Sequence, residues 1–144
     1  MIAVILSGHG GFASGIEKAI HQVIGEQPQF QAIDFPVDMT TPQLESAMRD
    51  AISLHDNGEG IVFLTDLLGG TPFRTASLLS QERNDIEVVT GTNLQMVAEM
   101  LLERDELNLF EFRQQALECG HRGMTSLADE LQQSKTQETC DDGI

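Results

Sequence analysis

Positive charge, cysteine and long apolar runs are all scarce in this sequence. Eight Lys and Arg stand against twenty-three Asp and Glu, which gives a formal net charge of −15. So acidic a chain cannot build the basic stripe that neutralises nucleic-acid phosphates. Its two cysteines, Cys119 and Cys140, lie far apart without metal-ligand spacing, which favours reduced thiols over a disulfide framework. Because no apolar run approaches the roughly 20 residues of a membrane helix, we expect no membrane insertion and a cytoplasmic location.

What the chain does contain is a series of short apolar strands, each ended by a glycine or a turn. Its 144 residues fit one domain with one core. The apolar run over residues 2–6 stops at residues 7–11, SGHGG, where three glycines surround a histidine. Such a run is typical of a fully buried strand in a parallel sheet. We therefore place His9 just past the carboxyl end of the first strand.

Strands and helices alternate along the rest of the chain. The apolar pattern predicts further strands over residues 29–34, 60–65 and 87–90, with a helix after each strand. A short final strand is expected over 124–127, and a polar, frayed tail over 132–144. The residues predicted to begin or end helices are Ser14, Thr41, Thr71 and Asn108 as N-caps, and Gly25, Gly120 and Gly123 as stops or interruptions.

This alternation predicts an α/β fold, a flavodoxin-like open parallel sheet of order 2-1-3-4 with helices on both faces. In that order the loops after strands 1 and 3 leave in opposite directions and open a crevice at the carboxyl ends of the strands. His9 lies in the first of these loops, and Asp66 begins the second. The topology therefore predicts that the two side chains lie side by side.

His9 and Asp66 are the residue types that a phosphoryl relay needs. A neutral imidazole carries a lone pair that can attack phosphorus without a separate base. A carboxylate on the other ring nitrogen fixes the tautomer and stabilises the positive charge that develops. We predict His9 as the phosphorylated nucleophile and Asp66 as the residue that orients it, with no metal or other cofactor held by this chain.

Glycine loops and a helix start can hold the three charged phosphoryl oxygens through backbone N–H groups. Arg74, shortly after the second loop, adds a positive charge there. The predicted phosphoryl-binding residues are Gly10, Gly11, Gly70 and Thr71.

Two other functions fit parts of the pattern. Residues 8–13, GHGGFA, match the dinucleotide fingerprint G-x-G-x-x-[GA], and Asp34 ends the second strand where a ribose-binding acid belongs. That interpretation leaves the second glycine loop and Asp66 unexplained. Without a nucleotide, Asp34 and Asp38 are expected to be solvated loop residues. A non-catalytic flavodoxin-like interaction module is the remaining alternative.

Several stretches together resemble the IIA domain of the mannose-type phosphotransferase system (PTS), over about residues 1–131. They are G-H-G at 8–10, the strand into Asp66, G-G-T-P-F at 69–73 and G-T-N at 91–93. The resemblance implies that His9 accepts a phosphoryl group from phosphorylated HPr and passes it to the IIB component, which phosphorylates a sugar at a membrane permease. Asp66 matches the orienting carboxylate, and Thr71 the hydroxyl residue near the phosphoryl group. Among branches of the family, the chain most resembles the galactosamine and N-acetylgalactosamine systems.

The resemblance also implies a homodimer in which a C-terminal antiparallel edge strand, here residues 124–127, is exchanged between subunits. Phe12 and Leu68 stand where some members carry larger aromatic residues, and Arg74 where others are uncharged. Some relatives continue through a linker into IIB, whereas this chain is expected to act as a separate soluble subunit. Its acidic balance fits transient docking to a protein with a basic patch.

Overall fold

One parallel sheet forms the centre of the molecule. The computed structural model describes residues 1–142, and its strands follow the order β2-β1-β3-β4 with all three pairings parallel. The predicted α/β sheet of order 2-1-3-4 is therefore confirmed. The strands are β1 (Ala3–His9), β2 (Phe30–Phe35), β3 (Ile61–Thr65) and β4 (Ile86–Val89).

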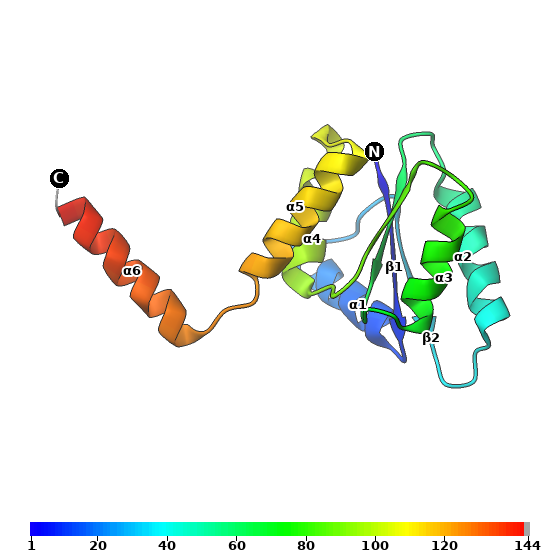
Figure 1. Cartoon of the computed structure of the whole chain (residues 1–144), viewed down its shortest axis with the longest axis horizontal. Coiled ribbons are helices and arrows are strands. Elements are labelled where there is room, and N and C mark those ends of the chain that lie inside the picture. The colour runs from blue at the N-terminus through cyan, green and yellow to red at the C-terminus, as the bar shows by residue number, and fades with distance from the viewer. Residues whose placement is uncertain (143–144) are drawn as a thin grey trace.

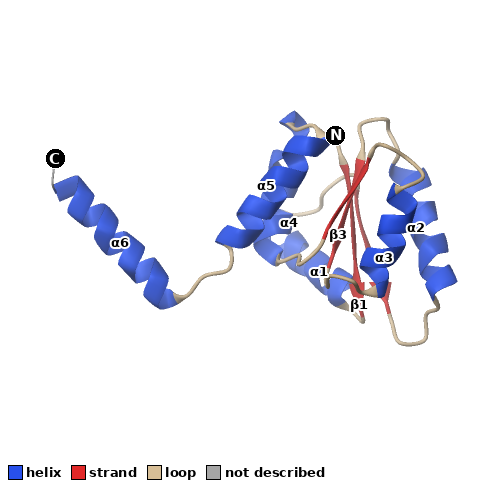
Figure 2. Ribbon diagram, in the orientation of Figure 1, coloured by secondary structure: helices blue, strands red, loops and turns tan. Residues whose placement is uncertain are grey.

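Helices cover both faces of this sheet, as Figures 1 and 2 show. One layer holds α1, α4 and α5, and the other holds α2 and α3. Successive side chains of β1 alternate between the layers, since Val4 packs with the first and Ile5 with the second. The helices are α1 (Phe12–Ile24), α2 (Thr41–His55), α3 (Thr71–Ser80), α4 (Leu94–Glu103), α5 (Leu109–Arg122) and α6 (Leu127–Asp142), with a 3-10 turn over Arg104–Glu106.

Capping chemistry decides where α2 and α5 begin. The N-cap of α2 is Thr40 rather than Thr41, because the Thr40 hydroxyl accepts the N–H of Gln43 and the Gln43 side chain accepts that of Thr40. Asn108 caps α5 as predicted. Gly120 does not interrupt α5, which continues to Arg122. Glycine stands at this position because it lies beneath the side chain of Met96, where a larger residue would collide.

The C-terminal segment departs most from the sequence prediction. Residues 124–127 do not form a strand, because 124–126 have no regular structure and Leu127 begins α6. An exchanged edge strand takes its hydrogen bonds from a second subunit, whereas a helix satisfies its backbone within one chain. The tail expected to be frayed from residue 132 is helical to Asp142, and residues 143–144 of that tail lie outside the described residues.

Helix α6 extends away from the sheet and its covering helices (Figure 1). The domain boundary predicted at residue 131 therefore falls inside a helix. Within residues 1–142, no helix combines the length and apolar character needed to cross a bilayer.

Candidate active site

His9 and Asp66 stand at the carboxyl ends of neighbouring strands. Strand β1 runs past the predicted end at residue 6 and includes His9, because it stays paired with β2 up to the register of His9 with Phe35. Asp66 directly follows β3, which pairs with β1 on its other side. The two side chains are in contact, so their predicted adjacency is confirmed.

A single carboxylate oxygen of Asp66 holds His9 at two points. Asp66 Oδ2 lies 2.8 Å from His9 Nδ1 and also accepts the backbone N–H of His9 at 2.8 Å. These contacts fix both the end of the strand and the orientation of the ring. The His9 side chain is 43% exposed and that of Asp66 13%. The ring is thus accessible, while its anchor is largely buried.

Contact with His9 sets the charge of Asp66. Burial on its own raises the pKa of this carboxyl, but hydrogen bonds from the His9 backbone and side chain, together with attraction to the imidazolium, outweigh it and lower the pKa below the ordinary value. Asp66 is therefore ionised at neutral pH. An ionised carboxylate can accept a hydrogen bond but cannot donate one. The ring nitrogen that contacts Asp66 must therefore be the donor, so we assign the ring proton of neutral His9 to Nδ1 and the lone pair to Nε2.

Two groups pack directly on the imidazole. The ring of Phe35 meets it edge-on, with centroids 5.8 Å apart and an interplanar angle of 74°. On another side lies Gly70, where an added Cβ would come within 2.6 Å of His9 Cε1 and 3.3 Å of Nε2. Position 70 therefore requires glycine, because any side chain would displace the ring.

The start of α3 faces the site without a side-chain cap. Gly70 is its N-cap and Thr71 its first helical residue, so the predicted role of Thr71 as the cap is wrong. The next residue, Pro72, has no N–H. Because the N-cap Gly70 packs on the imidazole, the positive end of the dipole of α3 is directed toward His9.

The predicted phosphoryl-binding residues divide into two kinds. The N–H of Gly10 donates to the Phe35 carbonyl at 2.8 Å, and that of Gly70 donates to the Leu67 carbonyl at 3.0 Å. Within the described part of the chain, the N–H groups of Gly11 and Thr71 have no such acceptor. Gly11 and Thr71 can thus offer hydrogen bonds to an anion, whereas Gly10, at φ +56, and Gly70 act through backbone shape.

Asp34 has a structural role that the sequence did not predict. It is not a solvated loop residue, because its Oδ1 accepts the backbone N–H of Ser14 at 2.8 Å, in the first turn of α1. Ser14, predicted as the N-cap, is instead the third residue of that helix. A carboxylate in this position takes up an amide of the first turn of α1 that a dinucleotide pyrophosphate would use. The geometry therefore disfavours the dinucleotide interpretation.

A family model and curated relatives of this chain both name PTS IIA components. The family model EIIA-man, described as PTS system fructose IIA component, matches residues 3–117. Over 134 residues the chain is 32% identical to YadI of Escherichia coli K12, named as a phosphotransferase enzyme IIA component, which covers 93% of this chain and 92% of that protein. The mannose-specific EIIAB component of the same organism is 32% identical over 127 residues, which make up 88% of this chain but 39% of that protein.

A solved structure adds the fold to this comparison. The crystal structure of phosphotransferase system component EIIA from Streptococcus agalactiae superimposes with a TM-score of 0.84 at 31% identity, over 90% of this chain and 99% of that one. The mannose/sorbose-specific IIA subunit from Enterococcus faecalis, at 22% identity, has the same fold with a TM-score of 0.80. This chain belongs to the EIIA-man family of PTS IIA components.

Proposed function

We propose that this chain is a cytoplasmic phosphocarrier in which His9 receives a phosphoryl group from phosphorylated HPr and transfers it to a IIB component. The observation that carries the proposal is the 2.8 Å contact between His9 Nδ1 and Asp66 Oδ2, which leaves Nε2 as the nucleophile. IIA components of the PTS are phosphotransferase relay proteins, so the family supports the same reaction.

The transfer needs no group beyond those of the two proteins. The Nε2 lone pair forms a bond to phosphorus as the bond between donor and phosphorus breaks, and the donor keeps that electron pair. The proton on Nδ1 stays in its hydrogen bond to Asp66, whose charge stabilises the positive ring. Transfer to IIB is the reverse process, with a nucleophile of IIB displacing Nε2.

The phosphoryl oxygens have hydrogen-bond donors at the helix starts. The N–H groups of Gly11 and Thr71 lack protein acceptors, as described above. The N-terminus of α3 adds a partial positive charge through Gly70. We assign the oxygens of phosphorylated His9 to these donors.

Exposed apolar side chains beside the site suit a docking protein. Leu67 and Leu68, directly after Asp66, are 60% and 74% exposed, and Val37, in the loop after β2, is fully exposed. The net charge of −15 favours a partner with a basic surface and accelerates its encounter. HPr and the IIB component would dock here in turn.

The sugar of the system is proposed from the resemblance to the galactosamine branch. We expect an amino sugar such as N-acetylgalactosamine or galactosamine. The chain would be assayed with its cognate IIB component and permease for phosphoenolpyruvate-dependent phosphorylation of these sugars beside mannose. Faster phosphorylation of mannose than of either amino sugar would refute this assignment.

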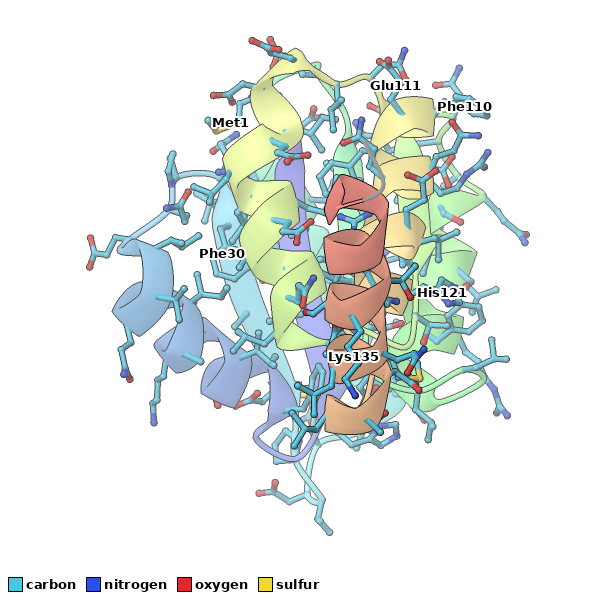
Figure 3. All side chains as sticks on the ribbon, turned by 90° about the vertical axis from the view of Figure 1, so that its left-hand side faces the viewer. Met1, Phe30, Phe110, Glu111, His121 and Lys135 are labelled. Atoms are coloured by element: carbon cyan, nitrogen blue, oxygen red, sulfur yellow. The ribbon has the colours of Figure 1, made fainter. Side chains whose placement is uncertain are left out.

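A homodimer joined through the C-terminal segment is also proposed. Leu127 and Leu131 of α6 are exposed, as is Met124 in the preceding connection. An isolated helix of this length is marginal in water, so apolar contact with a second subunit would stabilise it. Figure 3, viewed from the α6 side, has Lys135 on that helix, with Phe110 and His121 toward opposite ends of α5.

Phosphorylation of the purified protein tests the central proposal. The chain is incubated with phosphoenolpyruvate, enzyme I and HPr, and the intact mass is measured under non-acidic conditions. We expect the wild type to gain one phosphoryl group and His9→Ala to gain none. Replacing His121, an exposed histidine near the end of α5, is the matched control and should leave labelling intact. Undiminished labelling of His9→Ala would refute the proposal.

A further inference from the structure

Two basic side chains in the described part of the chain have no partner, namely Lys18 and Arg74. Each of the other lysine and arginine side chains has an interaction. Lys135 interacts elsewhere, and Arg104 is buried against backbone carbonyls. Those that bind carboxylates are Arg49, Arg83, Arg113 and Arg122. In so acidic a protein, an arginine that no carboxylate neutralises is available to bind an external anion.

Arg74 lies one helical turn beyond the residue that touches His9. Its backbone N–H donates to the carbonyl of Gly70 at 2.9 Å, and Gly70 packs on the imidazole. The helical rise places Arg74 about 6 Å along the axis from Gly70. Side chains of a helix lean toward its N-terminus, so a long one at this position covers the preceding turn. The exposed guanidinium of Arg74 is therefore within reach of the site.

The site itself lacks a full positive charge to balance a phosphoryl group. A phosphoryl group on Nε2 would bring negative charge close to ionised Asp66, in a chain of net charge −15. The donors at Gly11 and Thr71 are neutral amides. Neither loop, residues 8–13 or 66–73, contains a lysine or an arginine. Arg74 is the basic residue that directly follows the second loop.

We propose that Arg74 binds the phosphoryl group as it passes to and from Nε2 of His9, an inference that rests on the proposed role of His9. The planar guanidinium can donate two parallel hydrogen bonds to phosphoryl oxygens. In the transition state the charge spreads over the three equatorial oxygens, where such a donor acts most strongly. The bonds formed and broken are those of the transfer described above, and Arg74 exchanges no proton.

Single-turnover transfer from phosphorylated HPr tests this role. The rate at saturating HPr and the half-saturating concentration are measured for the wild type, Arg74→Ala, Arg74→Lys and Lys18→Ala. We expect Arg74→Ala to lower the saturating rate by about tenfold or more, with Arg74→Lys recovering part of the loss. Lys18→Ala is the matched control, because it makes the same change of net charge on α1 and should transfer at the wild-type rate.

The outcomes separate this inference from the proposed function. If the wild type is phosphorylated at His9 and Arg74→Ala keeps a saturating rate within about twofold of it, Arg74 does not bind the phosphoryl group. A change confined to the half-saturating concentration would also overturn the inference, since it would place Arg74 in contact with the partner alone. Failure to phosphorylate the wild type at all would instead refute the proposed function.

A second measurement examines phosphorylated His9 without a partner. Phosphorus NMR follows the titration of the phosphoryl group in the isolated phosphoprotein. Removing a bound cation raises the pKa of an anion, so Arg74→Ala should titrate at higher pH than the wild type and Lys18→Ala should not. Identical titration of all three proteins would contradict the inference. Thermal unfolding of each variant checks that the fold is unchanged.

Discussion

Gly70 lies against the imidazole of His9 so closely that a methyl group at position 70 would meet Cε1 at 2.6 Å. The same residue is the N-cap of α3. The reactive ring is therefore packed against the positive end of a helix, and the absence of a side chain permits this approach. Glycine at position 70 thus allows a negatively charged phosphoryl group on Nε2 to lie next to the positive end of α3.

Gly70→Ala should slow phosphoryl transfer and keep the fold, with a loss of stability no larger than the His9–Asp66 contact supplies. The new methyl group must push the ring out of its contact with Asp66, and misplacement of a reacting group by about 1 Å can cost on the order of a hundredfold in rate. Gly15→Ala, in α1, is the control, since a Cβ there would meet no atom within 4 Å. Single-turnover transfer and thermal unfolding are measured for both. Equal rates would show that the ring tolerates the added methyl.

Asp66→Asn should preserve the fold and slow the transfer by roughly a hundredfold. Asparagine has nearly the same shape but carries no charge to stabilise the positive ring that forms as Nε2 attacks. The measurement is the rate of phosphorylation of His9 at saturating HPr. Asp105→Asn, in the 3-10 turn at the opposite end of the strands, removes the same charge away from the site and should react normally. A wild-type rate for Asp66→Asn would remove Asp66 from the mechanism.

The contact between His9 and Asp66 should also make stability depend on pH. Because the folded-state pKa of Asp66 is below its ordinary value of 3.8, this contact stabilises the protein fully above about pH 4 and is lost as the pH falls through the lower folded value. The free energy of unfolding, measured with urea from pH 6 to pH 3, should differ between the wild type and Asp66→Asn by an amount that shrinks below pH 4. A constant difference would contradict the assignment.

The fold and the contact between His9 and Asp66 could be predicted from sequence because both depend on local patterns. Apolar runs ended by glycine mark buried parallel strands, and the strand order then brings His9 to Asp66. The role of Asp34 could not be predicted in this way, because the amide it accepts lies on a helix that becomes its neighbour only after folding. The predicted pairing of β2 with β1 is the signal that could have indicated this role, because it places the end of β2 next to the helix that follows β1.

The C-terminal segment was mispredicted for a different reason. From Gln132 onward it has little apolar periodicity, so its sequence carries weak information on whether it forms a strand, a helix or neither. What such a segment adopts depends on what it packs against. Residues 124–127 would gain strand hydrogen bonds only from a partner, and within one chain the helix that begins at Leu127 satisfies its own backbone.

Arg104 was also missed, and it supplies a prediction about stability. Its side chain is 1% exposed and donates to the carbonyls of Ile2 at 3.1 Å and Gln29 at 2.8 Å, and to that of Pro28. These acceptors lie at the amino ends of the strands, opposite the site. Arg104→Met removes the donors from these three carbonyls, of which that of Ile2 is buried, and should lower the free energy of unfolding by about 2–3 kcal/mol.

The control for Arg104 is Arg122→Met. Arg122 forms an exposed ion pair with Glu99, so its loss should cost less than about 1 kcal/mol. Urea unfolding measures both variants, and phosphorylation of His9 in the folded protein should be unchanged in each. Equal destabilisation of the two would show that the buried hydrogen bonds contribute no more than a surface pair.

Truncation after residue 126 tests whether the C-terminal segment joins two subunits. In α6, the side chains of residues 127–136 are all exposed, so the segment adds little to the core of its own chain. Light scattering should give a dimer for the full chain and a monomer for the truncated one. The double variant Leu127→Ser with Leu131→Ser should also weaken the dimer, whereas the polar change Gln133→Ala should not. Because the site is built from the loops after β1 and β3, the monomer should still be phosphorylated. If the full chain is monomeric, or the truncated chain remains a dimer, α6 is not the joining element.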